Sequence, residues 1–447
     1  MKYYFFYGSV VALTAGAVAF VGMFDLAISE YKTSAQLAAE AFAERRKSIE
    51  GRIQEARERS SKVKGLYVTA DVARGGSASG HELRAHLVAL AKTTEINGLV
   101  IDVKEVCGPD YHEASLKEFV SELRRAGIWT IARIVVFKDA SEIEAHPEWY
   151  LTRASAKKTG DECARKKYLR AKSNGGDATA HFWRDRKGGY WLDPASEGVR
   201  SYIVEFSKKI VDLGFDELQF DYIRFPSDGD VDQAFYPAWD GKSSKHEVMR
   251  SFFKFLSEGV RSHKPDIILS ADLFGYVATQ KEDSGIGQRL EDVGNYFDYI
   301  SFMVYPSHYY NGLYIPADAV SGFRGVNFSF AEARANPAAV VEHSLLFARN
   351  FLDGKNGTTT FMGRALPGAT SSVAASRSAM LFSIPRSRAR LRPWLEDFFH
   401  EDDRIAGRPH GIEKVRAQID AAERVGPHGW LLWNAANVYT EQALKKE

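Results

Sequence analysis

Short apolar runs alternate with longer amphipathic runs from residue 64 to the end of the chain. The short runs are rich in β-branched and aromatic residues, which favours strands, and the longer runs carry apolar residues at helical spacing. The predicted strands are residues 65–72, 98–105, 129–137, 217–225, 267–273, 299–305, 391–397 and 429–434. The predicted helices are residues 81–94, 116–126, 197–213, 246–262, 338–352 and 412–425. This alternation predicts a parallel sheet covered by helices.

Eight predicted strands in a row favour a closed (β/α)8 TIM barrel over an open doubly wound sheet. No Gly-x-Gly-x-x-Gly sequence follows the first strand to support the open, dinucleotide-binding alternative. In a barrel, residues of one parity on each strand face the lumen. The polar parity holds Tyr67, Thr69, Asp102, Lys104, Gln219, Asp221, Ser270, Asp272, Ser301, Tyr305, Glu396 and Asn434. The other parity is apolar, so we expect a polar lumen with its chemistry at the carboxyl ends of the strands.

The N-terminal segment contains an uncharged run, Tyr3 to Phe24, that is close to the ~20 residues needed to span a bilayer. We predict a signal anchor over residues 1–28, which places the barrel outside the cytoplasm on a single-pass membrane protein. Cleavage after the small-residue stretch at Ala17 to Ala19 is the alternative, and it predicts a secreted protein. Residues 29–63 are rich in Ala, Glu and Arg and predict a polar helical stalk.

The barrel is predicted to occupy residues 64–447, with insertions at about 153–187 and 311–387. Neither the net charge of +1 nor the basic first insertion, which lacks interleaved aromatic residues, supports nucleic-acid binding. Cys107 and Cys163 are the only cysteines and lie in loops after the second and third strands, so a disulfide between them is an open prediction. No His-Glu-x-x-His or Cys-x-x-Cys motif is present, and we predict no metal and no cofactor.

Carboxylates at the ends of two neighbouring strands are the candidate catalytic groups. Asp221 lies near the end of the fourth predicted strand and Asp272 near the end of the fifth. Glycoside hydrolysis needs one carboxylate to attack the anomeric carbon or activate water, and a second to protonate the leaving oxygen. We predict Asp221 as the nucleophile and Asp272 as the general acid/base, because neighbouring strands lie ≈ 4.8 Å apart and retaining enzymes hold their carboxylates close together.

Structural ion pairs are the alternative role for both carboxylates. Asp221 would then pair with Arg224, and Asp272 with Lys104 or Arg133. If Arg224 lies close to a catalytic Asp221, its positive charge favours the ionised form of the nucleophile.

Aromatic and polar residues near the same strand ends are predicted to bind a sugar. An aromatic ring stacks on the apolar face of a pyranose, and polar side chains hydrogen-bond its hydroxyls. The predicted substrate-binding residues are Asp102, Lys104, Gln219, Arg224, Tyr305, His308, Trp191, Glu396, Trp433 and Asn434. Asp102, Glu105 and Glu396 are alternative acids for the catalytic roles.

Five segments of the chain resemble one family in sequence and in order. They are GLYVTA (65–70), NGLVIDVK (97–104), GYWLDP (189–194), GFDELQFDYIRFP (214–226) and GWLLWN (429–434). Together they resemble the bacterial "putative glycosyl hydrolase" barrel family, distantly related to the alpha-amylase superfamily, over most of residues 64–440. The resemblance implies a TIM barrel, carbohydrate hydrolysis and a nucleophile at Asp221. The basic insertion and Glu396, where the family is expected to carry glutamine, are departures.

The leading functional hypothesis is an exported glycoside hydrolase acting on a cell-surface or extracellular oligo- or polysaccharide. A non-catalytic carbohydrate-binding barrel of the cell envelope is the alternative from another class. A third hypothesis is a substrate-assisted enzyme that uses one acid and Tyr305 and requires an N-acetyl sugar. The expected partners are the saccharide and, through the N-terminal helix, the membrane.

Overall fold

The computed structural model describes residues 34–153, 163, 181–355, 387, 389–399, 411–426 and 428–446. The chain divides into two units, Met1–Glu55 and Ala56–Glu447. Helix α2 (Ser34–Ser60) begins in the first unit and ends in the second. Within the described residues, no helix has both the length and the apolar character that crossing a bilayer requires. The anchor predicted for residues 1–28 lies outside the described residues and stays a prediction.

The second unit is a closed barrel of eight parallel strands. They are β1 (Lys64–Val68), β2 (Gly98–Glu105), β4 (Trp129–Val135), β5 (Glu217–Asp221), β6 (Ile268–Phe274), β7 (Tyr299–Met303), β11 (Trp394–Glu396) and β12 (Trp430–Trp433). Each strand pairs with its neighbours, and β1 closes the barrel by pairing with both β12 and β2. The predicted (β/α)8 fold is therefore confirmed.

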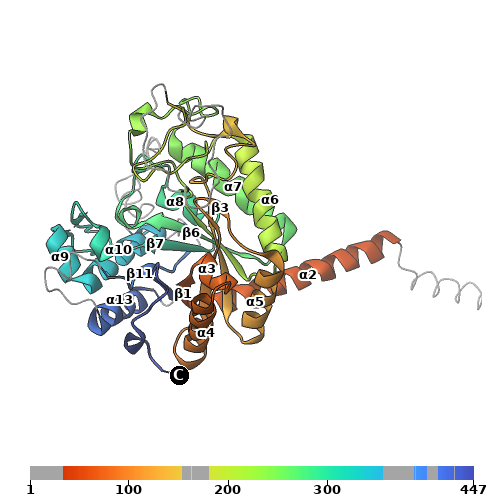
Figure 1. Ribbon diagram of the computed structural model, residues 1–447, viewed down its shortest axis with the longest axis horizontal. Helices are drawn as coiled ribbons and strands as arrows, with labels where there is room; N and C mark the ends of the chain where they lie inside the picture. The colour runs from red at the N-terminus through yellow and green to blue at the C-terminus, as the bar shows by residue number, and fades with distance from the viewer. Residues whose placement is uncertain are drawn as a thin grey trace, which may run out of the picture. The chain divides into compact units, whose positions relative to one another are not determined.

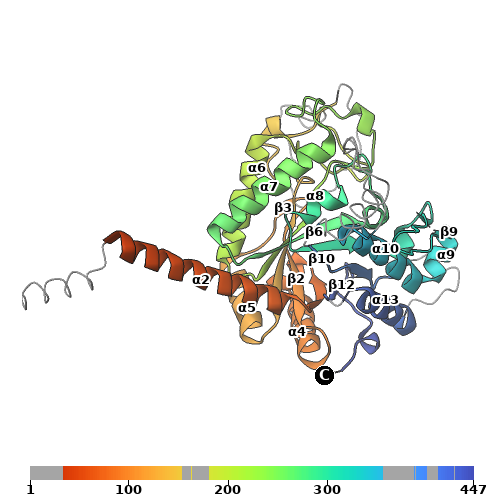
Figure 2. The ribbon, with the colours of Figure 1, turned by 180° about the vertical axis from the view of Figure 1, so that it is seen from behind.

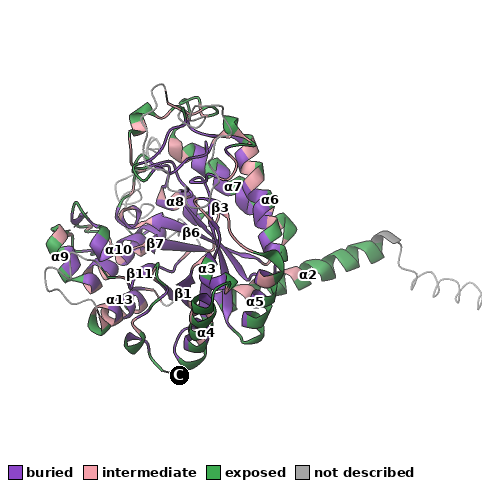
Figure 3. Cartoon of the chain, in the orientation of Figure 1, coloured by how far each residue is buried: buried purple, intermediate pink, exposed green. Residues whose placement is uncertain are grey.

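Helices surround the strands on the outside of the barrel (Figures 1 and 2). The main ones are α4 (Ala78–Thr93), α5 (Glu113–Arg125), α6 (Glu197–Asp212), α7 (Lys245–His263), α10 (Pro337–Leu352) and α13 (Ile412–Val425). In Figure 3 the strands are coloured as buried, whereas α4 and α5 carry exposed residues. The apolar residues that alternate with the lumen-facing ones along each strand pack against the helices, as the sequence pattern predicts.

Shorter helices and strands lie between the barrel strands and the main helices. They are α3 (Ala70–Arg74), β3 (Gly108–Pro109), α8 (Leu290–Gly294), β8 (Leu313–Ile315), β9 (Val326–Phe328), α9 (Phe330–Ala335) and β10 (Arg390–Leu391). Within the predicted insertion at 311–387, β8 and β9 form an antiparallel hairpin, whereas α10 packs against α13 as part of the helical layer.

Several strands are shorter than the sequence pattern predicts, and three of them show a local cause. The first ends at Val68 because Thr69 caps α3, its side chain accepting the backbone N–H of Val72. The fourth ends at Asp221, where Tyr222 turns the chain with a φ of 49°. The predicted strand 391–397 is divided into β10 and β11 at Pro393, which has no backbone N–H for a sheet ladder.

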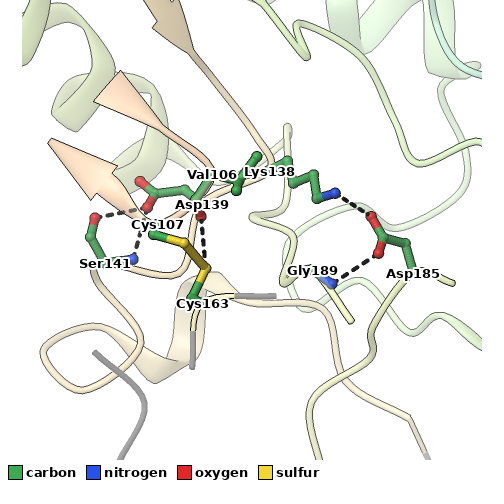
Figure 4. The surroundings of a disulfide bond; sticks show 8 residues. All are labelled: Val106, Cys107, Lys138, Asp139, Ser141, Cys163, Asp185 and Gly189. Atoms are coloured by element: carbon green, nitrogen blue, oxygen red, sulfur yellow. Dashed lines mark hydrogen bonds and ion pairs between the residues drawn. A yellow bond between two sulfur atoms is a disulfide. The ribbon is translucent and has the colours of Figure 1, made fainter. Parts of the chain in front are cut away.

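A disulfide joins Cys107, in the loop after β2, to Cys163, with a Cα–Cα distance of 5.4 Å. The open prediction of this bridge is confirmed, and Cys163 is the one described residue between Arg153 and His181. Figure 4 shows Asp139 and Lys138 beside the bridge, with Lys138 Nζ 3.1 Å from an oxygen of Asp185. The bridge therefore fixes one point of the basic insertion to the carboxyl-end face of the barrel.

The amino-terminal half of the lumen is closed by an apolar layer and a buried ion pair. Val63, Val100, Trp129, Ile131, Ile268, Tyr299 and Leu431 belong to one cluster inside the barrel. Beside it, Arg392 Nη1 donates to both oxygens of Glu217 at 2.9 and 2.8 Å, and both side chains are fully buried. This filled layer leaves the carboxyl ends of the strands as the face for chemistry.

Candidate active site

One arginine lies between three carboxylates at the carboxyl ends of the strands. Arg133, on β4, is 6% exposed and faces the lumen. Its Nη1 donates to Asp102 Oδ1 at 2.6 Å and its Nη2 to Asp221 Oδ2 at 2.5 Å. Its Nε lies 3.9 Å from Asp272 Oδ2. Arg133 therefore connects carboxylates from β2, β5 and β6 in one electrostatic group.

Asp221 accepts a hydrogen bond at each of its oxygens, and Arg133 is the donor to Oδ2. Its second oxygen, Oδ1, accepts the backbone N–H of Tyr222 at 2.6 Å. Tyr222 has a φ of 49°, a left-handed conformation that is uncommon for a bulky residue and often found at functional sites. The strained turn aims that N–H at the carboxylate, so the backbone and Arg133 together hold Asp221 in one orientation.

Asp272 has a different environment. Trp394 Nε1 donates to its Oδ1 at 2.8 Å, whereas no donor in the described part of the chain hydrogen-bonds to its Oδ2. Burial raises the pKa of Asp272 well above its usual range, and the nearby charge of Asp221 raises it further, against a lowering by Arg133. Asp272 therefore keeps its proton to higher pH than an ordinary carboxyl group.

The two carboxylates lie on adjacent strands in matching register. Phe220 on β5 is opposite Ala271 on β6, so Asp221 and Asp272 are the next residues along each strand. This arrangement is the one predicted from the sequence.

Asp102 supports Arg133 from the opposite side. Its second oxygen accepts the Tyr67 hydroxyl, and burial raises the pKa of Asp102 above its usual value. The Tyr67 ring stacks on Trp433 with centroids 3.9 Å apart, and the Arg133 guanidinium lies 5.1 Å from the Trp433 ring. Since both oxygens of Asp102 are engaged, its contacts fit a positioning role.

Tyr305 follows β7 and is buried next to this group. Burial raises the pKa of its hydroxyl well above the usual range, and the charges of Asp272 and Asp221 add to the effect. The Tyr305 ring packs against Phe398 and against His308, which is itself exposed. Tyr305 and His308 therefore lie at the mouth of the barrel as predicted.

Lys104 departs from the prediction. A register shift between Asp102 and Lys104 changes the side on which the rest of β2 projects. Lys104 Nζ bonds to Asp139 and to the carbonyl of Val135, both at 2.7 Å, and lies 5.8 Å from the ring of Tyr202 on α6. The expectation of an inward Lys104 was wrong, because one irregularity reverses side-chain alternation.

Gln219 and Glu396 lie in the barrel, each with a partner of its own. Gln219 is fully buried one step below Asp221, and its Nε2 donates to Ser301 Oγ at 3.1 Å. Glu396 accepts both the backbone N–H and the hydroxyl of Ser307 at 3.1 and 2.6 Å. These contacts fix the turn after β7.

Asn434 and Trp191 have structural contacts as well. Asn434 Nδ2 donates to the carbonyls of Asp397 and Val438 at 2.5 Å, which closes the loop after β12. Trp191 is buried and donates from Nε1 to Asp185 at 3.0 Å. Arg224 lies 5.0 Å from the Trp191 ring.

Arg133 is the central residue that sequence reasoning placed only as an alternative ion-pair partner of Asp272. The expected partner of Asp221 was Arg224, but Arg133 makes that contact. The signal lay in the strand 129–135, where an arginine of inward parity interrupts an otherwise uncharged run. A charge at such a position requires carboxylates from other strands. Among the described residues, no group of His, Cys, Asp or Glu side chains is placed to hold a metal ion.

Similar solved structures include three of low identity. A hypothetical protein from Ruminiclostridium thermocellum is 27% identical, with 46% of this chain and 96% of that chain covered and a TM-score of 0.34. A Thermus thermophilus alpha-galactosidase, in complex with p-nitrophenyl alpha-D-galactopyranoside, is 13% identical, with 85% and 60% covered and a TM-score of 0.42. A Geobacillus thermoleovorans alpha-amylase, complexed with acarbose, is 10% identical, with 85% and 72% covered and a TM-score of 0.42.

A family model described as "Putative glycosyl hydrolase domain" matches residues 65–362 and 367–439. No curated protein sequence matches the chain. The matched residues include β1 to β12 and the carboxylates around Arg133, and they make up most of the chain. The chain therefore belongs to this glycosyl hydrolase domain family.

Proposed function

We propose that this protein hydrolyses glycosidic bonds of an oligo- or polysaccharide, with Asp221 as the nucleophile and Asp272 as the general acid/base. The observation that carries the proposal is the contrast between two carboxylates at adjacent strand ends. Asp221 is held by Arg133 and a backbone N–H, whereas burial and the charge of Asp221 raise the pKa of Asp272. In glycosidases, a carboxyl group whose pKa is raised by its surroundings acts as the general acid beside a second carboxylate that acts as the nucleophile.

The proposed reaction has two steps. Asp221 attacks the anomeric carbon while Asp272 gives its proton to the departing glycosidic oxygen, which leaves a glycosyl ester on Asp221 and an ionised Asp272. Asp272 then takes a proton from water, whose oxygen attacks the anomeric carbon and releases Asp221. Arg133 and Asp102 position Asp221 throughout, and Trp394 orients Asp272.

Replacing each acid by its amide tests these roles. Asp221→Asn should lower the release of reducing ends from a polysaccharide panel by about 1,000-fold or more, because the nucleophile is lost. Asp272→Asn should lower it by about 100-fold to 10,000-fold for natural sugars and much less for an activated aryl glycoside, which needs little protonation. Azide should partly restore Asp272→Asn by replacing the activated water.

The control is Asp240→Asn, which removes an exposed carboxylate bonded to Lys242 and should leave turnover unchanged. Near-native turnover in Asp221→Asn, together with loss in Asp102→Asn or Glu396→Gln, would overturn the assignment. Saccharide binding with no turnover in the unaltered protein would favour the alternative function, a carbohydrate-binding barrel.

We also propose that the barrel works outside the cytoplasm, attached to the membrane by residues 1–28. The uncharged run from Tyr3 to Phe24 supports this location. The disulfide between Cys107 and Cys163 supports it independently, because such bonds persist mainly in oxidising compartments.

A further inference from the structure

Arg224 lies three residues after the proposed nucleophile and is only 5% exposed. Its guanidinium carbon is 5.0 Å from the ring of Trp191, 5.2 Å from that of Tyr222 and 4.3 Å from that of Phe274. These rings come from the segment before α6, the turn after β5 and the end of β6. Three aromatic residues therefore hold a cation in one place on the face that carries Asp221.

One edge of this guanidinium is open. Nη1 donates to the carbonyl of Phe225 at 2.9 Å. Within the described part of the chain, no atom accepts a hydrogen bond from Nε or Nη2 of Arg224, and both atoms retain contact with solvent. Nε and Nη2 share one side of the planar group, and their two parallel N–H bonds match the two oxygens of a carboxylate.

The other buried cations nearby already have carboxylate partners. Arg133 is shared by the active-site carboxylates, and Lys138 pairs with Asp185. No carboxylate oxygen of the described residues lies within 4.0 Å of Arg224. Burial lowers the pKa of Arg224 from its usual range, although the more distant charges of Asp221, Asp228 and Asp185 act against this lowering. An unpaired buried charge is costly in a protein interior, and a bound anion removes that cost.

We propose that Arg224 recognises the carboxylate of an acidic sugar, so that the substrate is a uronate-containing oligo- or polysaccharide. The inference rests on the proposed glycoside hydrolysis and deepens it by naming the substrate class. A sugar carboxylate accepts both N–H groups of the open edge, while the half-buried rings of Tyr222 and Phe274 border the same sugar. Arg224 then selects the substrate, and Asp221 and Asp272 cut it.

The test compares acidic oligosaccharides with their neutral counterparts. The probes are galacturonate, glucuronate, mannuronate and guluronate oligomers, each paired with the carboxyl-reduced form, in which a hydroxymethyl group replaces the carboxylate. Binding to the full chain is measured at about 0.15 M salt, where long-range attraction is largely screened. The unaltered protein should bind at least one acidic oligomer about tenfold to a hundredfold more tightly than its reduced form.

Two variants separate a specific role from a structural one. Arg224→Gln should abolish the preference, so that the acidic form binds no more tightly than the reduced form. Arg224→Lys keeps the charge but lacks the planar pair of donors, so it should retain only a small part of the preference. The matched control is Arg250→Gln, which removes an α7 arginine whose side chain is 46% exposed and should not change the preference.

The outcomes distinguish this inference from the proposed hydrolysis. Binding that favours the acidic form and depends on Arg224, without release of reducing ends, supports the inference and contradicts the hydrolysis. Hydrolysis of neutral saccharides only, unchanged in Arg224→Gln, supports the hydrolysis and overturns the inference. The absence of a preference for any acidic oligomer in the unaltered protein also overturns the inference. An equal loss of binding for the acidic and the reduced forms in Arg224→Lys overturns it as well.

Discussion

Asp221 and Asp272 are the same residue type on neighbouring strands, and their contacts make them chemically different. Asp221 accepts hydrogen bonds from Arg133 and from a backbone N–H. Asp272 receives one indole N–H and no hydrogen bond on its second oxygen from the described residues. Burial and the missing donor disfavour a charge on Asp272, which suits an acid that works by giving up a proton.

Asp272→Asn should stabilise the protein at neutral pH. The pKa of Asp272 is raised in the fold, so between the unfolded pKa and the folded pKa the folded state binds a proton that the unfolded state has lost. Stability therefore falls as pH rises through this window, and the full penalty remains above the folded pKa. Asn carries no charge, and its oxygen still accepts from Trp394.

Thermal unfolding across pH checks this prediction. The Tm of Asp272→Asn should be about 2 °C or more above that of the unaltered protein at about pH 8, and the two Tm values should be equal at about pH 4. As a contrast, Asp221→Asn leaves Arg133 with a weaker partner and should gain nothing at pH 8. A Tm difference for Asp272→Asn that is equal at both pH values would show that the buried charge is not its cause.

At the scale of elements, β10 and β11 bring Arg392 into the floor of the barrel. Arg392 bonds to Glu217 on β5 and to the carbonyl of Ser60 at the end of α2. Glu217 also accepts Trp129 Nε1 at 3.0 Å. The pair joins strands from opposite parts of the sequence at the end of the barrel that carries no proposed chemistry.

Removing one partner of this pair should destabilise the barrel strongly. Arg392→Leu leaves the Glu217 carboxylate buried and unpaired, at a cost of about 3–5 kcal/mol in the free energy of unfolding. Adding Glu217→Gln removes the charge and should recover part of that loss. Denaturant unfolding measures both, with Arg424→Leu as the control, since its pair with Glu342 is exposed and is worth at most about 1 kcal/mol. Equal losses for Arg392→Leu and Arg424→Leu would contradict the prediction.

At the scale of the whole molecule, attachment and export are open to a direct measurement. The full chain should stay in the membrane pellet through a carbonate wash, because residues 3–24 offer an uncharged length that suits a bilayer. A shortened version that begins at Ala56 keeps Ser60 as the partner of Arg392 and should be soluble. Recovery of a mature chain that begins at Phe20 would replace the anchor with a cleaved signal peptide.

The sequence by itself determined the barrel and the order and approximate positions of its strands, and it nominated the two candidate acids, because these follow from local patterns. Alternation along a strand has a period of two residues, so the inward parity of Asp102, Asp221 and Asp272 was readable without any contact information. The same rule failed at Lys104, where a register shift in β2 reverses the alternation. The predicted extension of the first strand to Val72 was also wrong, because the cap at Thr69 starts a helix there.

Only the tertiary structure decided which charges meet. Arg133 and Arg224 both carry a guanidinium near Asp221, and nothing in their spacing says which one pairs with it. The strand order β2–β4–β5–β6 brings Arg133 between Asp102, Asp221 and Asp272, whereas the turn at Tyr222 directs Arg224 toward Trp191 and Phe274. Ion pairing depends on distances between strands, which register and closure set and which a single sequence does not encode locally.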